Sequence, residues 1–511
     1  MRTIPELVDD AARQHGSRHW LVSDDASYSF AEAQIASEAV ATGLEARGVT
    51  KGDIVMLVAH NTPSHVIAWL GILRLGAIAL PVNPRSTAAE LVGFLDQSSP
   101  KLVIHDPPGD VALFDAHRAA VAPPELAGVD TLLASPAGTA PVRIAIEPHD
   151  PAVLIPTSGT TGRSKLVTQT HQGYVLAAEG FPSWLGLTAE DRLLTALPIF
   201  HINAPAYSIL GSMAVGASVV VLPRYSPSGF LDAVRRHGAT ETNMIGAMLE
   251  MLMRQPARAD DADNPLRLLY TGPSPTRARQ LEIEERFGLE IVCGYALSET
   301  TYGTVWPRGE RPYETLGVAR QHPTLGHIND ARVMADGVEV EPGATGELEL
   351  RNPAIMLGYY EMPDETAQVI VDGWLRTGDL VTRNADATFT FVARKKEVIR
   401  RRGENLAPGE VEDALVAHPE IVDAAVIAVP ADLGEDEVKA FLVVSEAAAV
   451  DPAALRAFLL ERLTPYKVPR FLEVVDGDLP RTPTGRVAKH RLPTNRTPTE
   501  IDLEQPQEAA P

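Results

Sequence analysis

Short apolar runs rich in β-branched residues alternate with amphipathic helical segments along the first half of the chain. "DIVMLVAH" (53–60) predicts a strand, "TPSHVIAWLGILRLG" (62–76) a helix, and "AIALPVN" (77–83) another strand. The pattern recurs from "GASVVVLP" (216–223) to "LEIVCGYA" (289–296). Strands that are apolar on both faces and joined by crossover helices are typical of parallel sheets with helices on both sides. The sequence therefore predicts an α/β fold.

Two changes of texture follow the α/β segment. Beyond about residue 320, a glycine-punctuated alternation of apolar and polar residues predicts antiparallel strands and hairpins. From about residue 391, two helix patterns and two strand patterns predict a compact α+β unit. Residues 493–511 are rich in Pro and Glu without periodicity, and we expect them to be disordered.

Composition excludes several classes of function. The chain has 511 residues and a net charge of −22, which argues against a protein that grips nucleic acid or an anionic membrane by charge. The single cysteine, Cys293, excludes an internal disulfide framework and a cysteine-rich zinc site. Because the N-terminus lacks an apolar signal region and the apolar runs are too short to span a bilayer, we expect a cytoplasmic protein.

The segment "PAVLIPTSGTTGRSKLVTQTH" (151–171) is the most informative stretch of the sequence. A predicted strand runs into "TSGTTGRSK", a loop dense in hydroxyl groups and glycines that ends at a lysine. Glycines allow backbone N–H groups to converge on an anion, and Ser and Thr hydroxyls add donors. The spacing is not that of a Walker A loop. An ordinary polar turn is the competing interpretation, but the composition favours a polyphosphate-binding loop.

This loop and five further motifs resemble those of the adenylate-forming superfamily of acyl- and aryl-CoA ligases, luciferases and peptide-synthetase adenylation domains. "TSGTTGRSK" resembles "TSGTTGxPKG", with Ser164 replacing proline and Leu166 replacing glycine. The remaining motifs follow in family order: "LPIFH" (197–201), "GYALSET" (294–300), "DGWLRTGDL" (372–380), "ARKKEVIRRRGENLAPGEVE" (393–412) and "YKVPRFLEVV" (466–475). The texture is closest to carnitine-CoA and fatty-acyl-CoA ligases.

The resemblance implies the domain organisation. We expect a large N-terminal domain over residues 1–393, with parallel sheets flanked by helices and a distorted β-barrel subdomain. A small mobile α+β C-terminal domain would occupy residues 394–492 and rotate about a hinge at Lys396 between two half-reactions.

The resemblance also implies roles in binding ATP and Mg²⁺. The phosphates would be cradled by Thr157, Ser158, Gly159, Thr160, Thr161 and Gly162, with Lys165 adding charge. Ser298 would contact the α-phosphate, and Glu299 would hold Mg²⁺, which favours carboxylate and phosphate oxygens. Tyr295 would lie against the adenine, and Asp379 and Arg394 would bind the ribose hydroxyls. For Lys165 and Glu299, solvated surface side chains are the alternative.

Other residues would shape the acid pocket and the second half-reaction. His201 would close one wall of the pocket, although a His beside Phe is more often a core residue. Asn203, Glu241 and Asn243 are polar residues of the pocket region, Gly246 stands where relatives have proline, and Gly272 is a further pocket residue. Gly403 would face the pantetheine channel. The arginines at 400–402 would either contact a CoA phosphate or form a solvated patch.

The C-terminal motif "PRTPTGRVAK" (480–489) departs from the family's "PRTxxGKxxR". Arg486 stands at the position of the catalytic lysine, and an arginine does not replace a lysine point charge without altering geometry. Arg486 could serve the same role, Lys489 could replace it, or the enzyme could activate another anion.

The expected function is that of an ATP-dependent, AMP-forming ligase that adenylates an acyl or aryl carboxylic acid and transfers it to CoA. The alternative is an ATP-dependent diazotase that activates nitrite and nitrosates an aryl amine. An inactive nucleotide-binding relative is a further alternative. The partners would be small molecules rather than nucleic acid or membranes.

Overall fold

The computed structural model describes residues 1–106, 125–128, 131–132, 144–157, 165–272, 274–401, 404–430, 436–445, 451–482, 487–497 and 499–504. The chain divides into two compact units. The large unit comprises residues 1–332, 349–377 and 386–389, and the small unit comprises residues 333–348, 378–385 and 390–511. The segment from 333 to 393 thus contributes to both units, whereas the sequence predicted one boundary after residue 393.

The large unit contains a seven-stranded sheet with the order β19-β8-β7-β4-β3-β5-β6. Its strands are β3 (Ile54–Val58), β4 (Ile78–Val82), β5 (Leu102–His105), β6 (Glu125–Gly128), β7 (Pro151–Thr157), β8 (Lys165–Thr170) and β19 (Gly358–Tyr359). Strands β6, β5, β3, β4 and β7 are parallel, and β8 is antiparallel to both β7 and β19. The predicted parallel arrangement of β3 and β4 is confirmed.

A second sheet of the large unit has the order β15-β14-β13-β12-β11-β9-β10-β1-β2. Its strands are β1 (His19–Val22), β2 (Ser27–Ser29), β9 (Arg192–Thr195), β10 (Ser218–Val221), β11 (Glu241–Asn243), β12 (Leu268–Thr271), β13 (Glu290–Leu297), β14 (Thr300–Val305) and β15 (Val318–Ala319). The central strands are parallel, and antiparallel strands close both edges. The carboxyl ends of β9, β11, β12 and β13 therefore meet at one edge of the sheet.

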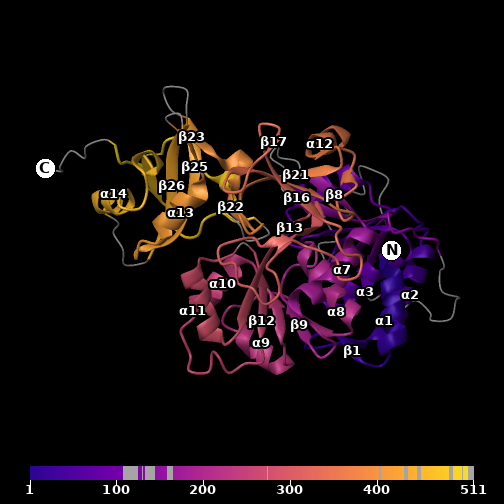
Figure 1. Cartoon of the computed structure of the whole chain (residues 1–511). Coiled ribbons are helices and arrows are strands. Elements are labelled where there is room, and N and C mark those ends of the chain that lie inside the picture. The colour runs from indigo at the N-terminus through magenta and orange to yellow at the C-terminus, as the bar shows by residue number, and fades with distance from the viewer. Residues whose placement is uncertain are drawn as a thin grey trace. The chain divides into compact units, whose positions relative to one another are not determined.

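Helices cover both sheets of the large unit (Figure 1). They are α1 (Ile4–His15), α2 (Phe30–Glu45), α3 (Pro63–Arg74), α4 (Ala88–Ser98), α7 (His171–Leu185), α8 (Leu210–Val215), α9 (Phe230–His237), α10 (Gly246–Met253), α11 (Arg277–Phe287) and α12 (Pro363–Val369), together with a π-helix, η1 (Ala204–Ile209). No helix among the described residues is long and apolar enough to cross a membrane.

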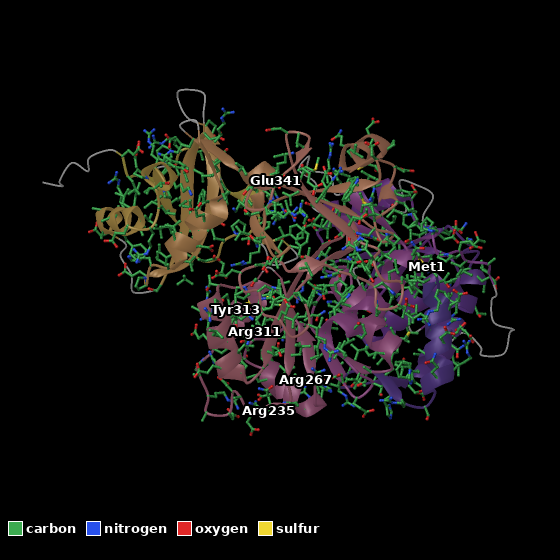
Figure 2. All side chains as sticks on the ribbon, in the orientation of Figure 1. Met1, Arg235, Arg267, Arg311, Tyr313 and Glu341 are labelled. Atoms are coloured by element: carbon green, nitrogen blue, oxygen red, sulfur yellow. The ribbon has the colours of Figure 1, made fainter. Side chains whose placement is uncertain are left out.

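One buried core joins the two sheets of the large unit. Val55 and Leu57 of β3, and Val219 and Val221 of β10, belong to the same cluster as Trp69 of α3. The alternate residues of β3 face a second cluster with α4. Those of β10 face a third cluster with α9, α10 and α11. Because both faces of each sheet are buried, the strands are continuously apolar, as the sequence indicated. At the surface of this unit, exposed arginines such as Arg267 form ion pairs (Figure 2).

Between residues 330 and 394 the chain forms the predicted antiparallel strands. These are β16 (Asp330–Ala335), β17 (Val338–Glu339), β18 (Thr345–Arg351), β20 (Ile370–Val371), β21 (Trp374–Arg383) and β22 (Phe389–Arg394). Strand β16 pairs with β17, and β20 pairs with β21, each in an antiparallel hairpin.

The C-terminal part of the small unit is the expected α+β arrangement. Its sheet has the order β25-β26-β27-β28. Its elements are η2 (Lys395–Glu397), β23 (Ile399–Arg401), β24 (Glu404–Leu406), α13 (Pro408–Val416), β25 (Ile421–Pro430), β26 (Asp436–Val444), α14 (Pro452–Leu460), η3 (Pro465–Lys467), β27 (Phe471–Val474), η4 (Lys489–Arg491) and β28 (Ile501–Asp502). The apolar faces of α13 and α14 pack on β25 and β26.

The segment after residue 492 differs from the expected disordered tail. Strand β28 pairs with β27 through Phe471↔Asp502 and Leu472↔Ile501. Glu500 lies 2.8 Å from the ammonium of Lys439, which is fully buried and also lies 2.7 Å from Glu473. A buried ammonium requires anionic partners, and Glu500 supplies one of them. The Pro- and Glu-rich composition carried no sign of this long-range pairing.

Candidate active site

The two ends of the predicted phosphate loop lie side by side. Thr157 ends β7 and pairs in register with Lys165, which begins β8. The hydroxyl of Thr157 donates to the carbonyl of Lys165 at 3.2 Å. The loop between them, including the predicted ligands Ser158, Gly159, Thr160, Thr161 and Gly162, lies outside the described residues.

Ser298 and Glu299 are the two residues of the turn that joins β13 to β14. Leu297 and Thr300 pair on either side of this turn. The side-chain amide of buried Gln169 donates to the carbonyl of Ser298 at 2.8 Å, and the N–H of Met356 donates to the carbonyl of Glu299 at 2.8 Å. Since Gln169 lies on β8, the strand that begins with Lys165 also holds the turn. The structure therefore links the loop end to the turn within one unit.

Tyr359 connects Glu299 to Lys165. Its phenol O–H donates to Glu299 Oε1 at 3.0 Å, and the Lys165 ammonium lies 4.3 Å from the centre of its ring. Sequence analysis missed Tyr359, because nothing in "LGYYEMP" distinguishes a site residue from a core tyrosine. Its position depends on the pairing of β19 with β8, which are separated by nearly two hundred residues of sequence.

The turn suits a Mg²⁺ ion held jointly with a phosphate ligand. Within the described ranges, no group of three or more His, Cys, Asp or Glu side chains gathers as a metal site. Mg²⁺ commonly binds through one or two carboxylates together with substrate phosphates and water. Glu299 is half-buried, and Tyr359 occupies one of its carboxylate oxygens. The carboxylate at this turn therefore suits Mg²⁺, which completes its coordination with phosphate and water, better than a metal that takes all of its ligands from the protein.

Tyr295 and Gly272 lie near the carboxyl ends of neighbouring strands. Tyr295 is half-buried on β13, opposite Thr304. Gly272 follows β12, and a Cβ atom there would lie 2.2 Å from the carbonyl oxygen of Gly294. Only glycine permits this close approach of the two strands. The predicted adenine-side and pocket residues thus lie on adjacent strands.

The predicted pocket residues His201 and Asn203 lie in the segment that follows β9, and Asn243 ends the adjacent strand β11. Asn243 is fully buried at the end of β11, and its side-chain amide donates to Asn203 Oδ1 at 2.8 Å. Among the described residues, Asn243 Oδ1 and His201 Nε2 are buried without a hydrogen-bond partner. Burial lowers the pKa of His201 to about 4, so this imidazole is neutral at pH 7. Because buried polar atoms usually have a hydrogen-bond partner, a polar ligand bound here could satisfy both.

Two other residues of the pocket region have different surroundings. Gly246 begins α10, and a Cβ atom there would meet open space. Glu241 begins β11 and is fully buried, and in the described structure neither of its carboxylate oxygens has a hydrogen-bond partner. Burial raises the pKa of Glu241 well above its usual range. Glu241 is therefore a buried carboxylic acid and is not part of the Asn203–Asn243 pair.

Asp379 and Arg394, the predicted ribose ligands, form an ion pair in the small unit. Arg394 Nε lies 2.6 Å from Asp379 Oδ1, and Asp379 is fully buried. Asp379 lies on β21 and Arg394 ends β22, which pairs with β21. The structure thus brings together two residues that the resemblance implied from two separate motifs.

The other predicted residues of the small unit have varied surroundings. Lys396 is exposed in the short helix η2. Arg400 is exposed, whereas Arg401 is buried and contacts Glu437 at 2.6 Å and Glu504 at 2.9 Å, so Arg401 is neither a solvated charge nor a free phosphate ligand. Arg486 lies outside the described residues, as does Gly403.

Comparison with known proteins identifies the family. A family profile for the AMP-binding enzyme matches residues 8–360, and a profile for the AMP-binding enzyme C-terminal domain matches residues 410–486. The chain belongs to the AMP-binding enzyme family. The expected adenylate-forming superfamily is therefore confirmed, as is the expectation of an ATP-dependent, AMP-forming ligase.

Relatives of this AMP-binding enzyme cover nearly its whole length. The chain is 32% identical to a sulfoacetate–CoA ligase of Cupriavidus necator over 505 residues, covering 96% of the chain and 97% of the relative. It is 31% identical to a crotonobetaine/carnitine–CoA ligase of Salmonella arizonae, covering 87% and 89%. An o-succinylbenzoate–CoA synthetase of Bacillus subtilis, solved with ATP and a magnesium ion, is 26% identical with a TM-score of 0.85, covering 95% of the chain and 98% of that protein. The predicted α/β fold with a small C-terminal domain is thereby confirmed.

Proposed function

We propose that this enzyme activates a carboxylic acid with ATP and transfers the acyl group to CoA. In the first half-reaction, a carboxylate oxygen attacks the α-phosphorus of ATP, the bond to the β-phosphate breaks, and acyl-AMP and pyrophosphate form. In the second, the CoA thiol attacks the acyl carbon and AMP leaves. The observation that carries the proposal is the Ser298–Glu299 turn joined through Tyr359 to Lys165, at the end of the phosphate loop. The three relatives described above are all named as enzymes that act with CoA.

The large unit supplies the phosphate and metal ligands. Thr157, the loop residues up to Gly162, and Lys165 would bind the β- and γ-phosphates. Ser298 would donate to the α-phosphate, and Glu299 would hold Mg²⁺, which neutralises phosphate charge when bound. This neutralisation matters because the first half-reaction brings two anions together. Tyr295 would lie against the adenine.

The small unit supplies the remaining groups. Asp379 would accept hydrogen bonds from the ribose diol while Arg394 donates to it. Arg486 would contact the α-phosphate and the carboxylate during adenylation. Rotation at Lys396 would then bring Gly403 toward the pantetheine of CoA. The bodies that this rotation would separate are the expected domains, 1–393 and 394–492. This boundary at the hinge differs from that of the compact units, which group Asp379 with Arg394.

The polar pair Asn203–Asn243 favours a short acid with a second polar group. Asn243 is fully buried and its Oδ1 lacks a partner among the described residues. An alkyl chain beside this pair would leave polar atoms unpaired, at a cost of about 1–3 kcal/mol each. A substrate hydroxyl, amine or amide could satisfy Asn243 Oδ1 by donation. Two of the relatives described above are named for sulfoacetate and for crotonobetaine or carnitine, which are also short polar acids.

The function is tested by mass spectrometry of products from a panel of short acids, with ATP, Mg²⁺ and CoA. We expect acyl-CoA and AMP with hydroxy- or amino-substituted acids, and less product with alkyl acids of equal length. Pyrophosphate release that requires nitrite and an aryl amine but not CoA would refute the proposal. The relatives reported above do not support that diazotase alternative. Absence of pyrophosphate release with every acid, and also with nitrite plus an aryl amine, would refute both functions.

A further inference from the structure

We propose that Tyr359 is a positioning residue that holds Glu299 for Mg²⁺ and Lys165 for the phosphates of ATP. The inference rests on the proposed function for the roles of Glu299 and Lys165. It adds a residue that neither the sequence motifs nor the roles described above include.

The hydroxyl of Tyr359 contacts the candidate metal ligand. It donates to Glu299 Oε1 at 3.0 Å, so it fixes the rotamer of the carboxylate and leaves Oε2 for a cation. The tyrosine is only 9% exposed, which shields this hydrogen bond from competition with water. Loss of a hydrogen-bond partner that orients a metal-binding carboxylate commonly lowers metal affinity by about tenfold to a hundredfold.

The ring of Tyr359 contacts the lysine at the end of the phosphate loop. The ammonium of Lys165 lies 4.3 Å from the ring centre, within the range of a cation–π interaction. The same side chain therefore contacts the candidate metal ligand with its hydroxyl and the cation at the loop end with its face. Lys165 and Glu299 therefore share one tyrosine as a contact.

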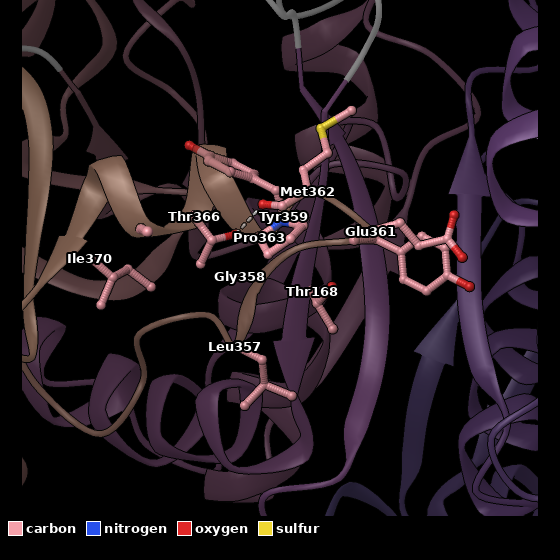
Figure 3. Close-up of a pocket in the computed structure, with 11 residues that line it drawn as sticks. Thr168, Leu357, Gly358, Tyr359, Glu361, Met362, Pro363, Thr366 and Ile370 are labelled. Carbon is pink, nitrogen blue, oxygen red and sulfur yellow. Dashed lines mark hydrogen bonds between the residues drawn. The ribbon is translucent and has the colours of Figure 1, made fainter.

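The backbone that carries Tyr359 is held by strand pairing and by a hydrogen bond to a threonine side chain. Gly358 and Tyr359 pair with Thr168 and Val167 of β8, and the N–H of Tyr359 donates to the hydroxyl of Thr366 at 2.9 Å (Figure 3). Gly358 has φ +147°, and a Cβ atom there would lie 2.7 Å from Thr366 Cγ2.

This backbone is thus held from both sides. Thr168, Gly358, Tyr359 and Thr366 also line a pocket of about 580 Å³ (Figure 3). Tyr359 is therefore anchored through its main chain while its side chain reaches Glu299. Rigid placement of this kind is what orientation of a metal ligand requires.

The test separates the hydroxyl from the ring. Tyr359→Phe keeps the ring and removes the donor, whereas Tyr359→Leu removes both. ATP binding is measured by titration calorimetry over a series of Mg²⁺ concentrations without any acid, and again in EDTA. We expect Tyr359→Phe to raise the half-saturating Mg²⁺ concentration about tenfold or more, with ATP affinity in EDTA unchanged. Tyr359→Leu should also weaken ATP binding in EDTA, because Lys165 would lose its cation–π contact with the tyrosine ring.

Two further variants make the test decisive. Tyr360→Phe is the matched control, since it removes a neighbouring tyrosine hydroxyl, and it should leave the Mg²⁺ dependence unchanged. If Tyr359 acts through Glu299, adding Tyr359→Phe to Glu299→Ala should cause no further change in Mg²⁺ dependence. A wild-type Mg²⁺ dependence in Tyr359→Phe, additive effects in the double variant, or equal effects of both Phe variants would overturn the inference.

The same preparations distinguish this inference from the proposed function. Formation of acyl-CoA and AMP tests the ligase reaction, whereas Mg²⁺-dependent ATP binding needs neither acid nor CoA. If no acid yields product but Tyr359→Phe still shifts the Mg²⁺ dependence, the proposed function fails and the positioning role stands.

Discussion

Asp379 Oδ1 lies 2.6 Å from Nε of Arg394, and the aspartate is fully buried while the arginine is partly exposed. The pair joins two adjacent strands of the small unit and leaves guanidinium nitrogen atoms for a further acceptor. This ion pair supplies the acceptor and the donor groups that the proposed ribose contacts would use.

Replacing Asp379 with Ala should weaken both ATP binding and the small unit. We expect the KM for ATP to rise on the order of tenfold, and stability to fall by about 1.5–3 kcal/mol, because a charge-assisted hydrogen bond is lost. Steady-state kinetics and thermal unfolding measure the two effects. Arg383→Ala is the control, since it breaks an exposed ion pair with Glu339. An unchanged KM for ATP would exclude Asp379 from the nucleotide site.

Arg486 and Lys489 are distinguished by their surroundings and by substitution. Lys489 Nζ lies 2.7 Å from Glu412 and 3.8 Å from Glu397, so it is engaged within the small unit. We therefore expect Arg486→Ala to slow acid-dependent pyrophosphate release by about 10²–10³-fold, the usual cost of losing a transition-state donor. Lys489→Ala should alter this rate by less than tenfold. The reverse order of effects would assign the catalytic role to Lys489.

Asn243→Leu should change substrate preference rather than abolish catalysis. The substitution removes the hydrogen bond to Asn203 and the unsatisfied Oδ1. We expect kcat/KM for polar acids to fall relative to alkyl acids of equal length, by about tenfold for one lost hydrogen bond. Competition between paired acids measures the ratio directly. A uniform loss for both classes would show that Asn243 supports the fold and does not select the acid.

Sequence reasoning identified the strands and helices best where the hydrophobic pattern was local. The strand at 53–60 and the helix at 62–76 appear as β3 and α3, with ends shifted by one or two residues. The pattern is reliable here because both elements are buried over most of their length. The family resemblance likewise selected Ser298 and Glu299, which share one turn.

What could not be predicted depends on contacts between distant segments. Tyr359 reaches Glu299 only because β19 adds to the edge of β8. Arg401, one of three consecutive arginines, is buried because Glu437 and Glu504 surround it. A single sequence shows charge and periodicity, but it does not show which distant carboxylate will neutralise a given cation.

Acidification should destabilise the protein through three buried histidines. Burial lowers the pKa of His65, His171 and His201 to about 4. Their unfolded forms titrate near the ordinary value of about 6.5. The unfolded state therefore binds more protons between these values, and the stability that these groups contribute is present above pH 6.5 and is lost as the pH falls toward 4.

The slope of stability against pH measures this effect. Each histidine contributes up to about 1.4 kcal/mol per pH unit in this window. Thermal or urea unfolding between pH 7.5 and 5 should show a shallower slope for His65→Gln than for the wild type. Equal slopes for His65→Gln and the wild type would contradict the assignment.

Glu241 should produce the opposite pH dependence. Its pKa is raised well above the usual range, chiefly by burial and also by repulsion from Asp191, although Arg267 partly offsets the shift. Arg267, an exposed residue labelled in Figure 2, pairs with Asp191 at 2.8 Å.

The raised pKa of Glu241 determines the sign of the pH dependence. Such a carboxyl group contributes stability that is present below its unfolded pKa of about 4.5 or slightly lower. This stability is lost as the pH rises toward the folded-state pKa. Glu241→Gln removes the titrating group and keeps the shape, so the loss of stability as the pH rises above about 4.5 should be smaller than in the wild type. Identical pH profiles for the two proteins in unfolding experiments would contradict a raised pKa for Glu241.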